Sequence, residues 1–210
     1  MTANSPAQIE RYKRELRRLE TLIDSVFALV IVLIAFDIPR PDDLGIDDFG
    51  EFLKQQVLAI GSSAIGLAVV LVYWFQSNAL LGNLVRTDGK HAVFSVFQVF
   101  TVLIYLYSVG LGIDLDNAPP ALAVQSLAAA LVGFMAAAAW WYASNDRHLL
   151  SPDLSDEEIG ALRLRVLAEP LTAVLTFALA FFSPALWELG WLAYPIFAAI
   201  LRRAGVHEKS

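Results

Sequence analysis

The sequence predicts an all-α membrane protein with six transmembrane helices and both termini in the cytoplasm. Apolar residues make up 57% of the 210 residues and charged residues only 17%, and the mean hydropathy is +0.58, which is far from the usage of soluble domains. The apolar residues gather in six runs, each near the length that crosses a bilayer. Lysine and arginine lie mainly in alternate loops, as they do when those loops face the cytoplasm. We therefore expect a single six-helix domain over residues 1–210.

The first two predicted spans cover residues 21–39 and 57–81. The first follows a charged stretch and ends at the proline-containing segment 39–41, because proline cannot continue a helix. No small-residue cleavage site follows this run, so it is expected to remain in the mature protein. The second span contains small residues at 61–63, which allow close contact between helices.

The third and fourth predicted spans cover residues 91–113 and 121–143. The third is rich in valine, phenylalanine and tyrosine. The fourth is entered through two prolines and ends in an aromatic cluster at residues 140–142. Tryptophan and tyrosine favour the membrane–water boundary, so we expect this cluster to lie at the interface.

The fifth and sixth predicted spans cover residues 167–182 and 185–201, and both are near the lower length limit for a span. Ser183 and Pro184 separate them. Before the fifth, Ser155 precedes three acidic residues, a pattern typical of a helix N-cap with an acidic first turn. This predicts a short cytoplasmic helix that leads into the fifth span.

The distribution of basic residues gives the predicted orientation. With the N-terminus inside, all of the fifteen lysines and arginines except Arg40 and Lys54 lie in cytoplasmic segments, while acidic residues collect in the outer loops. Positive residues accumulate on the cytoplasmic side of multi-pass proteins. An even number of spans is therefore favoured.

Catalysis, cofactor binding and nucleic-acid binding are not expected. The chain has no cysteine, and its three histidines are far apart in sequence, so no metal-ligand spacing such as H-E-x-x-H occurs. No serine has a convincing base near it in sequence. The net charge of −6 argues against nucleic acid as a partner. The sequence thus indicates neither an enzyme nor a bound metal or cofactor.

Polar residues within a span are costly and are often functional, and the first span has a recognisable set. Arg18, Asp24 and the Val-Phe-Ala tail at 26–28 match the R-x-x-x-F-S-D signature of the transmembrane protein 175 family, with Leu22 and Ile23 at the phenylalanine and serine positions. A Tyr-Trp pair in the second span and the six predicted spans add to the match. The chain therefore resembles this family of prokaryotic and lysosomal potassium channels.

The resemblance implies a potassium-permeable cation channel without a carbonyl selectivity filter, in which the first helices of four subunits surround a pore. It implies a homotetramer in the lipid bilayer of a bacterial inner membrane, with potassium or other monovalent cations as the permeant ions. By position, it places bulky constriction rings at Leu29, Leu33 and Phe36, with Val32 and Ser25 beside them. The constriction residues are spaced by four and three, so they share one helix face.

The resemblance also assigns Arg18 and Asp24 to a signature network. Six residues on a helix correspond to about 600° of rotation and about 9 Å of rise, so these two side chains lie on different faces. Asp24 is expected to bond to a neighbouring helix near the inner mouth, and Arg18 to contact a neighbouring helix or lipid head groups. Asp37, with the acidic residues of the loop at 42–51, is expected to form an outer mouth that attracts cations.

Two other functions remain open at the level of sequence. An aliphatic stripe at helical spacing also fits a face that packs against lipid, so the chain could be a non-conducting membrane scaffold. A secondary transporter would require paired halves and interrupted helices around a site at the membrane midplane, and no repeat of that kind is evident in the sequence.

Overall fold

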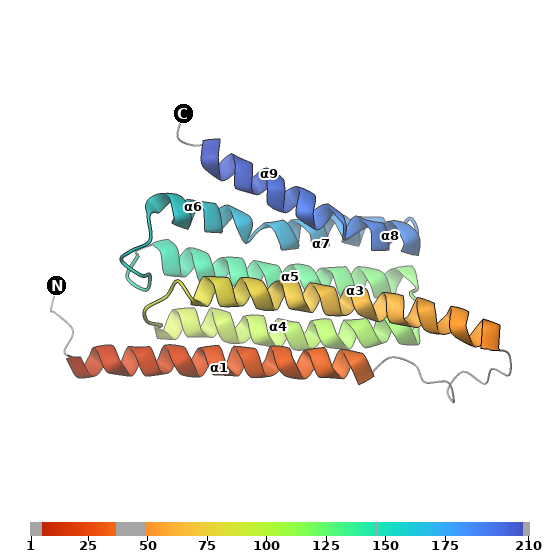
Figure 1. Cartoon of the computed structure of the whole chain (residues 1–210), viewed down its shortest axis with the longest axis horizontal. Coiled ribbons are helices and arrows are strands. Elements are labelled where there is room, and N and C mark those ends of the chain that lie inside the picture. Colours follow the sequence, from red (N-terminus) through yellow and green to blue (C-terminus); the bar gives the residue numbers. More distant parts are fainter. Residues whose placement is uncertain (1–5, 37–48, 146, 208–210) are drawn as a thin grey trace.

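The computed structural model describes residues 6–36, 49–145 and 147–207, and these residues form eight α-helices joined by short loops. The helices are α1 (Pro6–Phe36), α3 (Phe49–Leu81), α4 (Gly89–Asp114), α5 (Pro119–Asn145), α6 (Asp156–Arg165), α7 (Ala168–Leu179), α8 (Pro184–Gly190) and α9 (Ala193–His207). Helices α6 and α7 run in line, as do α8 and α9, so the eight helices form six rods (Figure 1). The start of α1 and the end of α9 lie toward the same end of the bundle.

The all-α class is confirmed, and five stretches of the described residues are long and apolar enough to cross a membrane. They are Glu10–Phe36, Ser63–Leu81, Gly89–Asp114, Pro119–Asn145 and Pro184–Ala204. The third and fourth agree with the predicted spans to within two residues at each end. The sixth predicted span is a helix pair with a break at Trp191 and Leu192, between α8 and α9.

The fifth predicted span is not among these five stretches because α7 has only 12 residues. Proline has no backbone N–H, so Pro170 cannot donate to the carbonyl four residues earlier. That carbonyl, on Val166, instead accepts a hydrogen bond of 3.3 Å from the side-chain amide of Gln76 on α3. A turn at Val166 and Leu167 thus separates α7 from the short helix α6, whose predicted cap is confirmed by a capping box between Ser155 and Glu158.

Helix α5 is the most buried of the five long apolar stretches. It packs against α7 so closely that a Cβ atom on Gly133 would lie 2.7 Å from Cδ of Pro170. Of the aromatic cluster predicted at the interface, Trp141 is 49% exposed, but Trp140 is 1% exposed and lies in the core. Trp140 therefore packs between helices and does not face the surroundings of the protein, and its depth in the membrane stays a prediction.

Two loops at the end of the bundle that holds the start of α1 are joined to each other. The amide of Val85 donates to the carbonyl of Leu149, and Nε of Arg86 donates to the carbonyl of His148. Asp88 caps α4 by accepting from the amide of His91, and its second oxygen accepts from the hydroxyl of Tyr142. Burial alone would raise the pKa of Asp88, but these hydrogen bonds and one with the His148 ring hold that pKa below its usual value.

Candidate functional site on helix α1

Helix α1 has one buried face and one exposed face. Six apolar side chains at spacings of three and four pack against α3 and α4, and each is at most 6% exposed. These residues are Leu16, Leu19, Ile23, Phe27, Val30 and Ile34. A stripe of this kind is what a helix presents to a core. In Figure 1, α1 lies at the edge of the bundle, away from α6 to α9.

The opposite face of α1 is also apolar, but nothing in the described chain covers it. Leu29 is 51% exposed, Leu33 37% and Phe36 66%, and the neighbouring Val32 is 50% exposed. The structure therefore brings the predicted constriction residues together on one surface of the single chain. We call Leu29, Val32, Leu33 and Phe36 the exposed stripe.

The geometry of the exposed stripe suits a ring around an axis. Leu29 and Phe36 are seven residues apart, so they differ by about 20° in direction and by about 10 Å in height. Every residue from Leu29 to Phe36 is apolar, so this length of helix offers no side-chain oxygen to replace the hydration shell of an ion. One turn before the exposed stripe, toward the N-terminus, Ser25 is exposed and donates its hydroxyl proton to the carbonyl of Thr21 at 2.7 Å.

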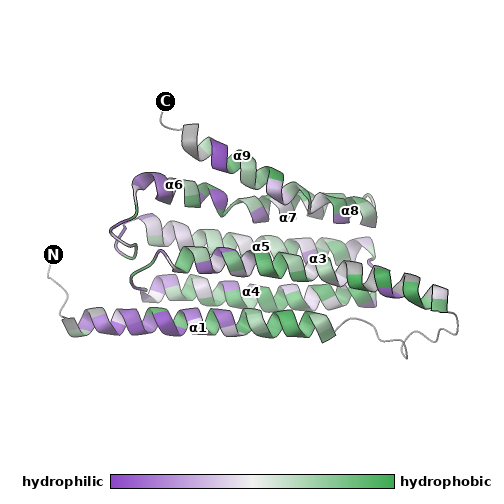
Figure 2. Cartoon of the chain, viewed as in Figure 1, coloured by the Kyte–Doolittle hydropathy of each residue, from purple (hydrophilic) through white to green (hydrophobic). Residues whose placement is uncertain are grey.

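Helix α1 is longer than a bilayer is thick. Its 31 residues extend about 46 Å at 1.5 Å per residue, whereas the hydrocarbon core is about 30 Å thick. The hydrophilic start of α1 projects beyond the ends of its neighbours, and the hydrophobic half lies beside them (Figure 2). Arg18 lies in this hydrophilic half, is exposed, and has no hydrogen bond or ion pair among the described residues.

Asp24 is bonded to Trp74, the tryptophan of the Tyr-Trp pair noted in the second predicted span. Nε1 of Trp74 on α3 donates to Oδ1 of Asp24 at 3.0 Å, which fixes the rotation of α1 relative to α3. The expected bond from Asp24 to a neighbouring helix is thus present in the structure. Arg18 does not take part in it, in keeping with their different faces. Asp37 and the acidic loop up to residue 48 lie outside the described residues.

A polar pair behind α1 was not identified from the sequence. Nε2 of Gln98 on α4 donates to the hydroxyl of Ser77 at 2.9 Å, and both side chains are buried beside Ile23. Ser77 lies three residues after Trp74, so it is one turn along the same helix. Glutamine within an apolar run is the one signal that could have pointed to this pair.

Comparisons with known proteins agree with this arrangement. The family model described as endosomal/lysosomal potassium channel TMEM175 matches residues 18–105, which run from the signature arginine into α4. A protein of Streptomyces collinus that is named as a potassium channel is 25% identical over 173 residues, which cover 80% of this chain and 84% of that protein.

Two solved structures have the same fold. The crystal structure of a lysosomal potassium-selective channel TMEM175 homolog from Chamaesiphon minutus matches with a TM-score of 0.64 and 20% identity over 94% of this chain and 100% of that one. A variant of the potassium channel MtTMEM175, crystallised with a nanobody fusion protein, matches with a TM-score of 0.60 and 20% identity over 92% of this chain and 94% of that one. With the signature on α1 and a match that runs into α4, the chain is similar to the TMEM175 family over residues 18–105.

Proposed function

We propose that this chain is a subunit of a potassium-permeable cation channel whose pore is lined by α1 and closed by the exposed stripe. The observation that carries the proposal is the stripe itself, an apolar face opposite the one that packs on the bundle. The potassium channel names of the relatives support the choice of ion. By family resemblance the assembly is a homotetramer with four α1 helices around its axis.

The position of α1 favours other copies of the chain as partners of this face. It is an edge helix, it packs on one side only, and it projects beyond the bundle at its start. The family match begins at Arg18 and covers the rest of α1, all of α3 and most of α4, so it includes the exposed stripe and the two helices on which α1 packs.

The closed state follows from the chemistry of the stripe. Rings of Leu29, Leu33 and Phe36 around a narrow axis expel water, and a dehydrated ion finds no compensating ligand there, so conduction stops by dewetting. A carbonyl filter is not required for this gate. Val32 lies beside the constriction residues within the stripe, and Ser25 lies one turn before Leu29, so the Ser25 hydroxyl oxygen is the nearest polar group for an ion on the inner side.

Cation preference and orientation rest on charge. Asp37 and the acidic loop after it would raise the local cation concentration at the outer mouth. The basic residues at 11–18, in the first half of α1, favour the end of the bundle where α1 starts as the cytoplasmic end. On this basis both termini are inside, and the bacterial relative supports a bacterial inner membrane as the location.

Potassium flux from liposomes tests the proposal. Leu29→Ala should increase the leak of potassium, because a smaller ring wets more readily, whereas Leu127→Ala on α5 should not. Leu127 is a matched control, since it is also 51% exposed but lies on another helix. If neither the folded wild-type protein nor the folded L29A variant passes potassium, a scaffold is favoured, and saturable exchange of a substrate would favour a transporter. Equal leak from the L29A and L127A variants would contradict the proposed gate.

A further inference from the structure

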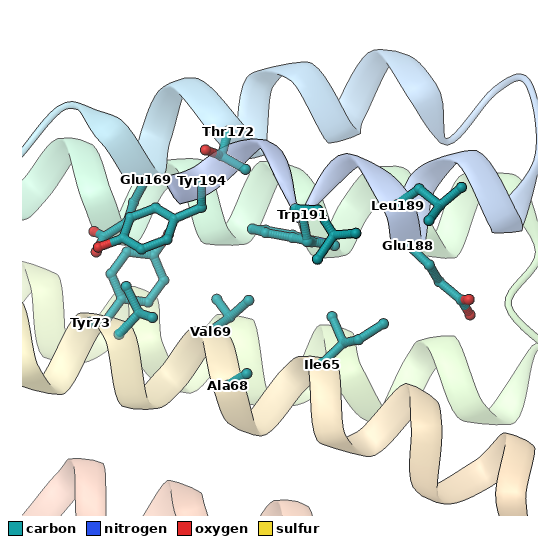
Figure 3. Close-up of a pocket in the computed structure, with 12 residues that line it drawn as sticks. Ile65, Ala68, Val69, Tyr73, Glu169, Thr172, Glu188, Leu189, Trp191 and Tyr194 are labelled. Carbon is teal, nitrogen blue, oxygen red and sulfur yellow. The ribbon is translucent and has the colours of Figure 1, made fainter. Parts of the chain in front are cut away.

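A second feature lies away from α1, in a cavity between α3, α7, α8 and α9. The cavity has a volume of about 360 Å³, which is at the small end of the range for organic ligands. Its walls are aliphatic and aromatic side chains, among them Ile65 and Val69 from α3 and Leu189 from α8 (Figure 3). A cavity of this composition would accept an apolar chain.

One carboxyl group is buried at one end of this cavity. Glu169, at the start of α7, is 5% exposed, and its Oε2 has no hydrogen-bond partner among the described residues. Two nearby hydroxyl groups are used elsewhere, because that of Tyr73 donates to the carbonyl of Ala129 and that of Thr172 donates to the carbonyl of Ala168. Arg165 on α6 interacts with Glu169 electrostatically, but it is exposed and forms no ion pair within the described chain. A buried carboxyl oxygen without a donor is costly, so it marks a place where a ligand would be stabilised.

Aromatic rings surround this carboxyl group. Tyr73 and Tyr194 converge on Glu169 in Figure 3, and Trp191 lies farther along the same wall. The faces of such rings attract cations, most strongly where water is excluded. The end of the cavity that holds Glu169 therefore combines an acceptor with cation-binding walls, while the rest is apolar.

We propose that this cavity binds a lipophilic organic amine, with its nitrogen on Glu169 and its hydrocarbon part along the α3 and α8–α9 walls. The amine enters from the bilayer as the neutral base and takes the proton of the neutral carboxyl group, which gives an ammonium–carboxylate pair with no net charge. Pairing avoids the cost of a single buried charge. An acyl chain or an alcohol of the same length fills the walls but has no basic nitrogen, so it forms no ion pair with Glu169. The proposal does not depend on the pore function of α1.

Binding of octylamine to the full-length protein in lipid nanodiscs tests this assignment. Wild-type protein should bind octylamine more tightly than octanol, and Glu169→Gln should weaken octylamine binding by about tenfold or more, since it removes the charged partner. Glu188→Gln is the matched control, because Glu188 also lines the cavity but is exposed at its other end. Equal binding of octylamine and octanol, or equal affinity of the E169Q and E188Q variants for octylamine, would overturn the proposal.

A measurement on the wild-type chain covers the case in which the E169Q variant fails to fold. A lipophilic carbodiimide modifies buried, protonated carboxyl groups, and peptide mass spectrometry identifies the modified residue. Octylamine should slow the modification of Glu169, and octanol should slow it much less. Equal protection by the two compounds would show that only the apolar walls are recognised and would refute the role of Glu169.

Discussion

The hydrogen bond from Trp74 to Asp24 is expected to stabilise the packing of α1 on α3, and a double-mutant cycle measures it. Asp24→Ala removes the acceptor and Trp74→Phe removes the donor. A hydrogen bond to a charged group contributes about 1.5–3 kcal/mol, but Asp24 is exposed in the single chain, so we expect a coupling of about 1 kcal/mol. For a chain of this length that corresponds to about 2–4 °C in Tm.

Thermal unfolding in detergent, followed by circular dichroism, provides the four Tm values of the cycle. The loss of Tm in the double variant should be smaller than the sum of the losses in the two single variants, because the hydrogen bond can be lost only once. Trp141→Phe is a matched control, since this exposed indole forms no hydrogen bond among the described residues. Fully additive losses of Tm in the double variant would show that the bond contributes nothing to the folded state.

Two further variants probe the rest of the bundle, each by Tm. Gly133→Ala should lower Tm, because its Cβ would lie 2.7 Å from the rigid Pro170 ring and overpacking of this kind costs about 1–3 kcal/mol. Gly160→Ala is the control and should not lower Tm, because no neighbouring side chain lies within 4 Å of the added Cβ. A similar Tm for both variants would contradict the close contact of α5 with α7. Asp88→Ala should lower Tm at neutral pH by the loss of a helix cap worth about 1 kcal/mol and of two side-chain bonds. The pKa of Asp88 is lowered in the folded state. The stabilisation by its carboxylate is therefore present above the unfolded pKa of about 3.9 and is lost as the pH falls through the folded pKa. A difference in Tm between variant and wild type that is as large at pH 3 as at neutral pH would refute this.

The apolar runs predicted the membrane helices well where a local signal ended them. The third span begins at the cap residue Asp88 and the fourth at Pro119, and both boundaries can be recognised from neighbouring residues alone. The start of α1 was missed by fifteen residues, since hydropathy detects only its apolar half. The charged half from Pro6 to Glu20 is rich in arginine and glutamate, which favour helix without being apolar.

The contacts that define the sites could not be read in the same way, because they join residues far apart in sequence. Gln76 stabilises the turn before α7 across 90 residues, and Trp74 reaches Asp24 across 50. Each needs α3 to lie against a particular neighbour, and hydropathy does not specify neighbours. The exposed stripe on α1 was predicted correctly as a shared face, since helical spacing alone decides it. The sequence shows a glutamate at position 169, near the start of the fifth predicted span, but it does not show that this carboxyl group is buried without a hydrogen-bond partner for its Oε2.

Helix α3 contributes neighbouring residues to the cavity with Glu169 and to the contact with α1. Tyr73 and Trp74 are consecutive residues, so their side chains leave the helix about 100° apart. The first lines the cavity with Glu169, and the second bonds to Asp24 on α1. Any rotation or shift of α3 would therefore move both a wall of the cavity and the donor that bonds to Asp24. The cavity and the proposed pore are therefore connected through α3, even though no described residue of α1 lines the cavity.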